Sequence, residues 1–414
     1  MCAVKMRGLF LAVMVSLAAP MPAWAEQAAA LVGELRVEGN ERTTAPVILG
    51  AAGIKSGDRF GPETAAEVQR RVFNLRLFRE VTVTQEARGS EVDVAIRVVE
   101  RWTLLPVPFV GASSRGVRGG AFLLESNLFG RNKVAGLGAL YGGEGPSAFA
   151  LYRDPGIGGR RALLRSMVRY GDLVREQFDG ERRTYAYRDE RFEAQLAGGY
   201  QWTRWLATYL GWYGGVGSAE VVDEEMAPPE NGPLYGWTAE VEIRAQDFHL
   251  YFNEGLWARA VYRQAARALG ADRDVVELVG FAQYARRVIG DQSASLTVQG
   301  VVSEGDEVLD AALLGGVPGT RGFERLGLWA ERAATAALEH QIPILHFDWG
   351  IWTVNGFAEV GWVKWRDRRD WFATPGAGFR LYLLGVAFPA LGVDVAYSTD
   401  DRRLLGMGSF GLSL

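Results

Sequence analysis

The chain has 414 residues, a formal net charge of −4 and 52 glycines. The net negative charge argues against nucleic-acid binding, which needs a basic surface. After the N-terminal segment, no stretch of about 18 residues is apolar and uncharged, which excludes a helical membrane protein. A secreted β-protein or a β-barrel of an outer membrane remains.

The N-terminal segment has the parts of a secretory signal peptide. Basic residues precede the apolar run GLFLAVMVSLAA, and Ala23 and Ala25 form a small-residue cleavage site. We expect residues 1–25 to be removed by cleavage before Glu26. A membrane anchor is the alternative, but the run is short and no stop-transfer charges follow it. The single cysteine, Cys2, leaves with this segment, which excludes disulfides and thiol chemistry from the mature chain.

Residues 31–101 alternate like strands at both ends and have helical periodicity between them. The stretch GELRVEGN predicts a strand, and TTAPVILGAAG predicts a helix with a threonine cap and a closing glycine. The stretch GPETAAEVQRRVFNLRLF puts Val68, Val72 and Leu75 on one helical face. EVTVTQEA and EVDVAIRVVE then alternate as two strands. The predicted order is β-α-α-β-β.

The segments LRVEGNERT, KSGDRF, LFREVTV and VDVAIRVVER resemble a POTRA (polypeptide-transport-associated) domain. Gly39, Asn40, Gly57 and Phe78 are among the matching residues. A generic α+β module is the alternative interpretation. The resemblance implies an exposed strand edge that captures extended peptides by β-augmentation, and it implies no enzymatic residue set.

Residues 104–414 contain recurring windows of alternating polar and apolar residues. In RFEAQLAGGY, for example, Phe192, Leu196 and Tyr200 share one face, and Glu193 lies on the other. A soluble β-sandwich would also alternate, but short and long connections alternate here, as they do in outer-membrane barrels. We therefore predict an antiparallel transmembrane β-barrel of 16 strands.

The expected strands and connections can be placed along the sequence. The strands are expected to begin near residues 104, 118, 132, 146, 161, 190, 203, 234, 254, 274, 292, 333, 351, 374, 391 and 405. Long connections are expected at 171–189, 217–233, 304–332 and 363–373. Several tryptophans suit the aromatic girdles at the membrane interfaces, although each could instead pack a loop; they are Trp202, Trp205, Trp212, Trp352 and Trp362.

The sequence lacks the usual signatures of an enzyme. The three histidines, His249, His340 and His346, form no HExxH motif, and no G-x-S-x-G elbow occurs. We expect His249 in a turn and His340 on the lipid face of its strand. The loop GGVPGTRG lacks the Gly-Lys-Ser/Thr of a phosphate-binding loop. We therefore expect no catalytic residues, no metal site and no cofactor.

Three further stretches resemble the outer-membrane assembly and translocation superfamily, which includes the BamA and TamA insertases and the two-partner secretion transporters. They are ESNLFGRN with Asn127, Leu128, Phe129, Gly130 and Arg131, YRDPGIGGRR with Asp154 and Pro155, and GGVPGTRGFE with Arg321, Gly322 and Phe323. The chain departs from the superfamily pattern in Thr320, in Asn132 and in its ending GMGSFGLSL, where Phe410 replaces a terminal aromatic residue. A single POTRA domain puts accessory lipoproteins in doubt and weakens the secretion interpretation.

Arg321 lies in the glycine-rich loop LLGGVPGTRGFERLG. From the residues alone, three roles are open for Arg321. It could be a charge in solvent, it could bind an anion, or it could pair with a group inside the protein. Strand parity in WTVNGFAEVGW places Glu359 on the inward face. The resemblance implies that the loop folds back into the barrel and that Arg321 meets Glu359, where the superfamily usually has aspartate. Phe323 is expected beside this contact.

The resemblance implies a barrel assembly and insertion factor in a Gram-negative outer membrane, with its POTRA domain in the periplasm. Its expected partners are unfolded outer-membrane or secreted proteins, the lipid bilayer, and periplasmic chaperones or accessory lipoproteins. The seam between the first strand, LLPVPFVG, and the last, GSFGLSL, is expected to open toward lipid. A protein-translocation pore or passive channel is the second hypothesis, and a barrel enzyme is the third.

Overall fold

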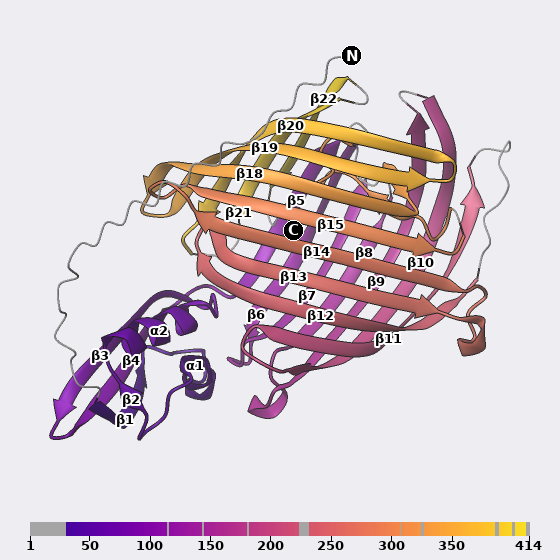
Figure 1. The fold of residues 1–414 in the computed structure, drawn as a ribbon. Helices are drawn as coiled ribbons and strands as arrows, with labels where there is room; N and C mark the ends of the chain where they lie inside the picture. The colour runs from indigo at the N-terminus through magenta and orange to yellow at the C-terminus, as the bar shows by residue number, and fades with distance from the viewer. Residues whose placement is uncertain are drawn as a thin grey trace, which may run out of the picture.

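The computed structural model describes residues 30–113, 116–142, 145–179, 182–222, 232–306, 308–323, 327–385, 389–399 and 402–410. The predicted signal peptide, residues 1–25, lies outside this part of the chain. A small α+β domain is followed by a closed antiparallel barrel of 16 strands, which confirms the predicted fold class (Figure 1). Within the described residues, no helix has the length and apolar character needed to cross a membrane.

The N-terminal domain has one more strand than its sequence pattern predicts. Its elements are β1 (Ala30–Glu38), α1 (Ala45–Ala52), β2 (Arg59–Phe60), α2 (Pro62–Phe73), β3 (Phe78–Arg88) and β4 (Glu91–Glu100). The predicted order β-α-α-β-β omitted β2, because a two-residue strand is too short to alternate. The sheet order is β2-β1-β4-β3, with β1 and β4 parallel. β3 therefore forms one edge of the sheet.

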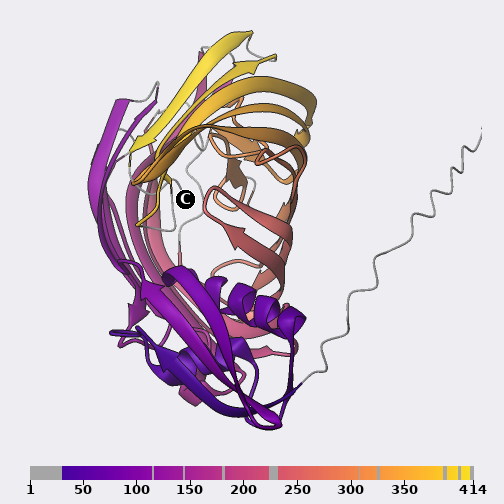
Figure 2. The ribbon, with the colours of Figure 1, turned by 90° about the vertical axis from the view of Figure 1, so that its left-hand side faces the viewer.

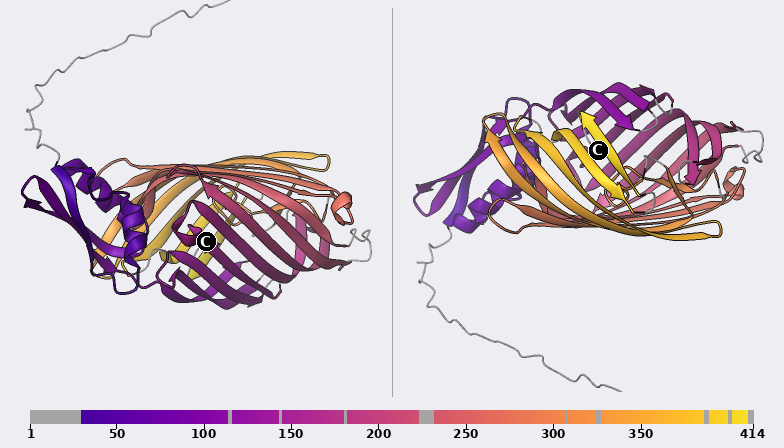
Figure 3. Two further views of the ribbon diagram at one scale, coloured as in Figure 1. Left: turned by 90° about the horizontal axis from the view of Figure 1, so that it is seen from below. Right: turned by 90° about the horizontal axis from the view of Figure 1, so that it is seen from above.

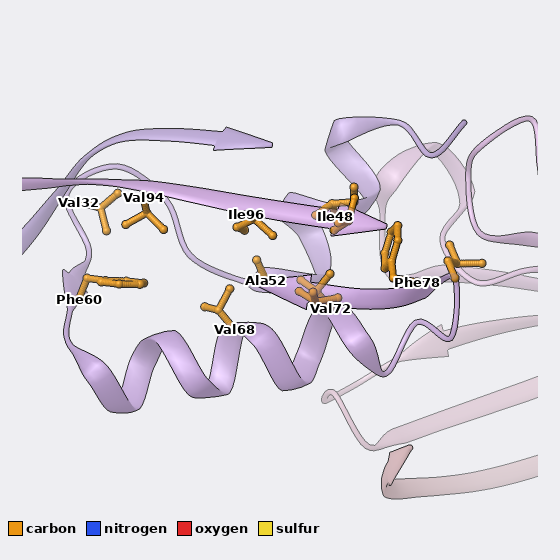
Figure 4. Packing of buried hydrophobic residues seen from close by; sticks show 12 residues of the cluster. Val32, Ile48, Ala52, Phe60, Val68, Val72, Phe78, Val94 and Ile96 are labelled. Carbon is orange, nitrogen blue, oxygen red and sulfur yellow. The ribbon is translucent and has the colours of Figure 1, made fainter. Parts of the chain in front are cut away.

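The core of this domain lies between the sheet and the two helices (Figure 4). Val68 and Val72 of α2 are fully buried, as the predicted helical face requires, and they pack in one cluster with Val94 and Ile96 of β4. Leu75 follows α2 and is partly buried against the same cluster. Each buried aliphatic side chain contributes roughly 1.5–3 kcal/mol, so this cluster holds the helices onto the sheet.

The barrel strands begin close to the predicted positions. They are β5 (Leu104–Ser113), β6 (Gly116–Leu128), β7 (Lys133–Gly142), β8 (Ser147–Asp154), β9 (Ala162–Asp179), β10 (Arg182–Gln201), β11 (Leu206–Val221), β12 (Leu234–His249), β13 (Phe252–Ala265), β14 (Val275–Arg287), β15 (Ser293–Glu304), β18 (Arg332–Phe347), β19 (Gly350–Trp365), β20 (Arg368–Leu383), β21 (Pro389–Ser398) and β22 (Arg403–Phe410). A short hairpin, β16 (Ala312–Leu314) and β17 (Leu328–Ala330), lies in the connection between β15 and β18.

Two of the predicted long loops are instead extended hairpins. The segment 171–189 belongs almost wholly to β9 and β10, and 363–373 belongs to β19 and β20. The polar residues of these segments suggested loops. Solvent-exposed strands can nevertheless be polar, because oppositely charged residues on neighbouring strands stabilise their pairing. In the first hairpin, Arg188 bonds to both carboxylate oxygens of Asp172 on the neighbouring strand. The segment 217–233 begins in β11, and its residues 223–231 lie outside the described part of the chain.

Side chains alternate between the lumen and the outer surface. Phe192, Leu196 and Tyr200 are 47%, 53% and 42% exposed on the outside, whereas Glu193 lines the lumen. Trp202, Trp205 and Trp212 are exposed, whereas Trp352 and Trp362 are half-buried. His340 is exposed on its strand, and His346 lies near the end of β18. His249 ends β12 and is not in a turn, so that prediction was wrong by one position.

The POTRA-like domain lies across one side of one end of the barrel (Figure 2). Views from below and above show the same placement, with the two helices next to the barrel end (Figure 3). The domain thus borders the opening of the lumen at this end.

Candidate functional site

The connection between β15 and β18 enters the barrel. It borders a lumen cavity of about 1470 Å³, whose lining also includes Arg76 of the N-terminal domain. Val317, Pro318, Arg321 and Phe323 from this connection line the same cavity. We call residues 315–323 the lumen loop.

The lumen loop is bound to Glu359 of β19. Arg321 Nε lies 2.6 Å from Glu359 Oε1, and the backbone N–H of Arg321 donates to Glu359 Oε2 at 2.8 Å. The backbone N–H of Gly319 donates to Glu359 Oε1 at 2.8 Å. Both charged residues are only 1% exposed. The structure therefore brings together the two residues that parity and resemblance linked, and one carboxylate fixes both the side chain and the backbone of the loop.

Arg321 has further partners that the sequence analysis missed. Its NH1 lies 2.7 Å from Glu339 Oε2 and 3.3 Å from Asp394 Oδ2, and its guanidinium stacks over the Phe357 ring at 3.5 Å from the centroid. Arg380 bonds to the same two carboxylates, Glu339 and Asp394. Strand parity in TAALEHQ and LGVDVAYS places both acids inward, so this signal was present in the sequence. Their convergence on one arginine depends on barrel closure.

Local backbone geometry lets the loop approach the wall. Gly319 has φ +96°, which glycine adopts without strain. A Cβ on Gly322 would lie 2.1 Å from Thr374 Oγ1 of β20, so that only glycine fits there. Thr320, which departs from the superfamily pattern, is 2% exposed, and its hydroxyl accepts the Gly315 N–H at 3.1 Å. Its hydroxyl therefore closes a turn inside the loop.

Phe323 packs next to the ion-pair network, on the neighbouring part of the wall. Its ring lies 4.7 Å from that of Phe372 on β20, in an edge-to-face arrangement. This geometry is the one that aromatic quadrupoles favour. The contact adds an apolar anchor just after the arginine.

The same connection has a second anchor near its start. Asp310 receives two hydrogen bonds from Arg273, each of 2.7 Å, and both side chains are about 5% exposed. Nearby, Val308 and Leu309 pack with an aromatic cluster drawn from several elements. The aromatic members of this cluster are Tyr185, Tyr187, Trp329 and Trp365. Trp329 and Trp365 pack against this connection, and neither is among the five tryptophans predicted for the girdles.

The barrel closes where its last strand, β22, meets its first strand, β5. Within the described residues, β22 and β5 share three residue pairs, Gly408↔Ala112, Ser409↔Gly111 and Phe410↔Val110. On its other side, β5 pairs along its whole length with β6, from Leu104 to Ser113. The ladder between β22 and β5 ends at Phe410, the last described residue of the chain. The predicted last strand, 408–414, extends past the described residues at 411.

The turn between β6 and β7 holds the N-terminal domain. Asn127 Nδ2 donates to Thr43 Oγ1 at 2.9 Å, and both residues are buried. The Gly130 carbonyl accepts the Thr44 backbone N–H at 2.9 Å and its hydroxyl at 3.2 Å. Thr44 stands at the cap position of α1 but makes no side-chain cap bond. The predicted cap residue therefore serves as a contact with the barrel.

Several other motif residues shape this turn or a nearby one. Asn132 has φ +55°, a conformation that asparagine tolerates, and its N–H donates to Asn127 Oδ1. Phe129 is 78% exposed, Arg131 is exposed and Leu128 is half-buried. Asp154, which is 4% exposed, pairs with Lys133 at 2.8 Å. It also accepts the Gly156 N–H, which fixes the turn that contains Pro155.

The predicted residues of the N-terminal domain have structural roles. Gly39 has φ +79°, and a Cβ there would meet the Val98 carbonyl at 2.2 Å. Asn40 Nδ2 donates to the Thr43 carbonyl at 2.9 Å, which orders the segment that touches the barrel. Gly57 has φ +87° and donates to the Val32 carbonyl. Phe78 is fully buried in the core.

A second contact joins α2 to the β12–β13 turn. Asn74 Nδ2 donates to Asp247, and Asn74 Oδ1 accepts the Phe248 backbone N–H, both at 2.8 Å. Arg76 NH2 donates to Asn253 Oδ1 at 2.8 Å, and its guanidinium lies over the Phe248 ring. Burial and neighbouring arginines lower the pKa of Arg76 to about 10, so that it stays charged at neutral pH. No pattern in the sequence indicated this contact.

Comparisons with known proteins agree with this architecture. Residues 30–101 match the POTRA family described as "Surface antigen variable number repeat". BamA of Nitratidesulfovibrio vulgaris, an outer-membrane protein assembly factor, is 30% identical over 131 residues, which are 30% of this chain and 16% of that protein. The aligned part thus spans a small share of that relative.

Solved structures share the fold. BamA from Haemophilus ducreyi lacking POTRA domains 1–3 aligns with a TM-score of 0.56 and 13% identity, covering 92% of this chain and 84% of that one. CdiB from Escherichia coli aligns with a TM-score of 0.62 and 11% identity, covering 93% of this chain and 77% of that one. Residues 30–101 therefore match the POTRA family, part of the chain is similar in sequence to BamA, and nearly all of the chain shares the fold of the BamA and CdiB structures.

Proposed function

We propose that this protein inserts β-barrel proteins into the outer membrane through its lateral seam. The observation that supports this most directly is that the barrel closes between its last strand, β22, and its first strand, β5, which directly follows the N-terminal domain. Unpaired backbone groups in hydrocarbon cost several kcal/mol each, so these two strands, once separated, would favour pairing with a strand that enters from the side.

The N-terminal domain supplies a receiving surface in this proposal. β3 is an edge strand of 11 residues, and it pairs only with β4 in the described sheet. An unfolded substrate in the periplasm would add to this edge as a further strand. The two contacts of the domain with the β6–β7 and β12–β13 turns hold this edge at the end of the barrel.

The proposal includes no chemical step catalysed by the protein and no cofactor. The free energy comes from the substrate, because burying its lipid-facing strands in the bilayer removes apolar surface from water. The three histidines lie apart on β12 and β18, and the lumen acids near Arg321 are engaged in ion pairs.

A disulfide across the seam tests the lateral route. Gly111 and Ser409 are directly opposite each other in the ladder, where Cα atoms are about 4.5–5.5 Å apart, within the range that a disulfide spans. We expect the G111C/S409C variant to lose insertion activity when oxidised and to regain it on reduction. The matched control V110C/G119C joins β5 to β6 and leaves the ladder between β5 and β22 without a crosslink. Equal activity of both oxidised variants would contradict the lateral route.

A translocation pore is the second candidate, because the lumen cavity extends from Arg76 of the N-terminal domain to Leu309 and Asp310 in the connection between β15 and β18. Depletion of the protein followed by outer-membrane proteomics separates the two functions. Loss of many barrel proteins supports insertion, and loss of one secreted protein supports translocation. Unchanged outer-membrane and secreted proteins would contradict both. Single-channel recording adds a direct readout, since a large steady conductance favours a pore over a barrel closed by its loop.

A further inference from the structure

The first four barrel strands, β5 to β8, are largely apolar on both faces. On the outer face, Leu123 and Leu137 are 41% and 58% exposed, as expected of a lipid-facing surface. On the inner face, Phe109, Phe122 and Phe149 line the lumen cavity. A barrel lumen is ordinarily polar, and the wall around the lumen loop follows that rule. The apolar inner face of β5 to β8 therefore has a cause other than the barrel fold.

The three phenylalanines form a continuous surface. The ring centroid of Phe122 lies 5.8 Å from that of Phe109 and 5.4 Å from that of Phe149. Phe122 and Phe149 belong to strands on either side of β7, and their rings meet over Gly138 of that strand. A Cβ on Gly138 would lie 2.2 Å from the Phe122 ring, so the contact depends on glycine.

Two leucines continue this surface toward the N-terminal domain. A Cβ on Gly136 of β7 would lie 3.2 Å from Leu124 and 3.3 Å from Leu151, so both side chains lean over the same strand. Residue 136 has the parity of Gly138, which puts the leucines on the inner face with the rings. We call this surface the apolar lumen face; it comprises Phe109, Phe122, Leu124, Phe149 and Leu151.

An arginine stands at the end of the apolar lumen face. Arg153 lies two residues after Leu151 on β8 and so shares its inner face. Its Nε is buried, and among the described residues the Arg153 side chain has neither a hydrogen bond nor an ion pair. A buried donor that lacks an acceptor is unfavourable. The position is therefore suited to an anionic group.

The surroundings of Arg153 carry an excess of positive charge. Arg165 stands directly opposite Arg153 on β9 and contacts Glu240 and Glu242. Arg244 also pairs with Glu242, at 2.6 Å. These two arginines already match the two carboxylates in charge, so Arg153 adds a positive charge that the carboxylates do not balance.

Arg76 of the N-terminal domain lies near the same corner of the lumen. Burial and the charges of Arg244, Arg153 and Arg101 lower the pKa of Arg76 to about 10. At neutral pH Arg76 is still charged, so it adds to the positive potential. An anion that enters from this end of the barrel meets that potential beside the apolar lumen face.

The apolar lumen face suits an acyl chain better than a peptide. An acyl chain spans one leaflet, about 15 Å, which is half of the hydrocarbon core. From Arg153 to Ser147, β8 extends about 20 Å at about 3.4 Å per residue. The backbone groups of β6 and β7 are bonded to neighbouring strands on both sides. A peptide on this face would therefore leave its own N–H and C=O groups against apolar side chains, and an acyl chain has no such groups.

We propose that the lumen binds one phospholipid, with its phosphate on Arg153 and one acyl chain along the apolar lumen face. The phosphate supplies the acceptor that Arg153 lacks. The chain covers Leu151, Phe149 and Phe122, which removes their apolar surface from water. The proposal rests on these side chains and is independent of the proposed insertion of barrel proteins.

Photocrosslinking from inside the barrel tests the site. The protein carries p-benzoylphenylalanine in place of Phe149 and is embedded in nanodiscs of phosphatidylglycerol, and unheated electrophoresis shows that the barrel is folded. We expect illumination to give an adduct with the mass of one phosphatidylglycerol. The same group in place of Leu137, on the outer face of β7, reports the lipids around the barrel. A folded barrel without a lipid adduct at 149, or with an adduct there to residues 411–414 or to another peptide, would overturn the proposal.

Arg153→Gln tests the phosphate site. We expect the lipid adduct at 149 to fall at least about tenfold, because charge-assisted hydrogen bonds to the phosphate are lost, and the adduct at 137 to stay unchanged. Arg153→Lys should restore part of the adduct at 149. Arg263→Gln is the matched control, since Arg263 also lines the lumen but pairs with Glu277 at 2.9 Å. An undiminished adduct at 149 in folded R153Q, or an equal decrease in R263Q, would contradict a phosphate on Arg153.

A competition between two lipids tests the same site with Arg153 intact. In nanodiscs that hold equal amounts of phosphatidylglycerol and uncharged diacylglycerol, we expect the adduct at 149 to favour phosphatidylglycerol at least about tenfold. At 137, on the outer face, we expect no such preference. Equal adducts of the two lipids at 149 would show that the apolar face binds chains without a headgroup site, which overturns the proposal even if R153Q fails to fold.

Discussion

The wall around the lumen loop and the seam of the same barrel differ in how strongly their contacts fix them. At the wall, Glu359 alone accepts three hydrogen bonds from the loop, and Arg321 also reaches Glu339 and Asp394. At the seam, the described ladder has three residue pairs and ends at Phe410, the last described residue. Within the described residues, buried charges hold the lumen loop, whereas backbone pairing joins the two strands of the seam.

The largest expected effect is at Arg321. The Arg321→Ala substitution leaves Glu359 buried without its cation, and breaking a buried pair costs about 3–5 kcal/mol. We expect the folded barrel to be lost at a lower temperature in unheated electrophoresis. Arg332→Ala is the matched control, since its partner Glu304 and the arginine itself are more than half exposed. An equal loss of thermal stability in both variants would contradict the idea that the wall around the lumen loop is the rigid region. A failure of cysteines at 321 and 359 to crosslink in membranes would contradict it as well.

Gly322→Ala is expected to have the next largest effect. Its Cβ would lie 2.1 Å from Thr374 Oγ1, and overpacking of this kind costs about 1–3 kcal/mol. The added substitution Thr374→Ala should restore much of the thermal stability, because it removes the clashing atom. Gly356→Ala on the same wall has open space around its Cβ and is the control. A destabilised G356A variant or an unaffected G322A variant would show that packing against the loop is not the cause.

Asn127→Ala tests the contact between the β6–β7 turn and the N-terminal domain, where the expected effect lies between those at the wall and at the seam. It removes the bond to Thr43 and the acceptor for the Asn132 N–H, at a cost of about 1–2 kcal/mol because Asn127 and Thr43 are buried. We expect faster proteolysis between the N-terminal domain and the barrel, with the barrel itself still folded. Arg131→Ala, an exposed change in the same turn, should leave proteolysis unaltered. Wild-type proteolysis of N127A would show that this turn does not hold the domain.

The smallest effect is expected at the seam. Val110→Ala should change thermal stability by less than about 0.5 kcal/mol, because Val110 is 52% exposed on the outer face. Val363→Ala in β19, where the side chain is 5% exposed, should cost about 1–2 kcal/mol. Both changes remove the same atoms, so their difference measures the contrast between seam and wall. Equal losses of stability in the two variants would show that the seam and the wall do not differ in this way.

Much of this architecture could be predicted from the sequence, because its signals are local. Alternation of period two gave the strands, and it placed Glu359 inward without knowledge of the fold. The β9–β10 and β19–β20 hairpins were missed because polar residues at strand ends resemble loops. The short strand β2 was missed because two residues form no pattern. The contacts of Asn74 and Arg76 with the β12–β13 turn join residues more than 170 positions apart, which no local signal encodes.

The sequence by itself determined which residues face the lumen and which loop carries the arginine. These properties follow from side-chain parity and from the chemistry of glycine. Only the tertiary structure decided that three acids meet Arg321 and that Thr44 contacts the barrel. The reason is physical: closing a barrel brings distant strands into register, and their hydrogen-bond directions and charge clusters exist only after closure.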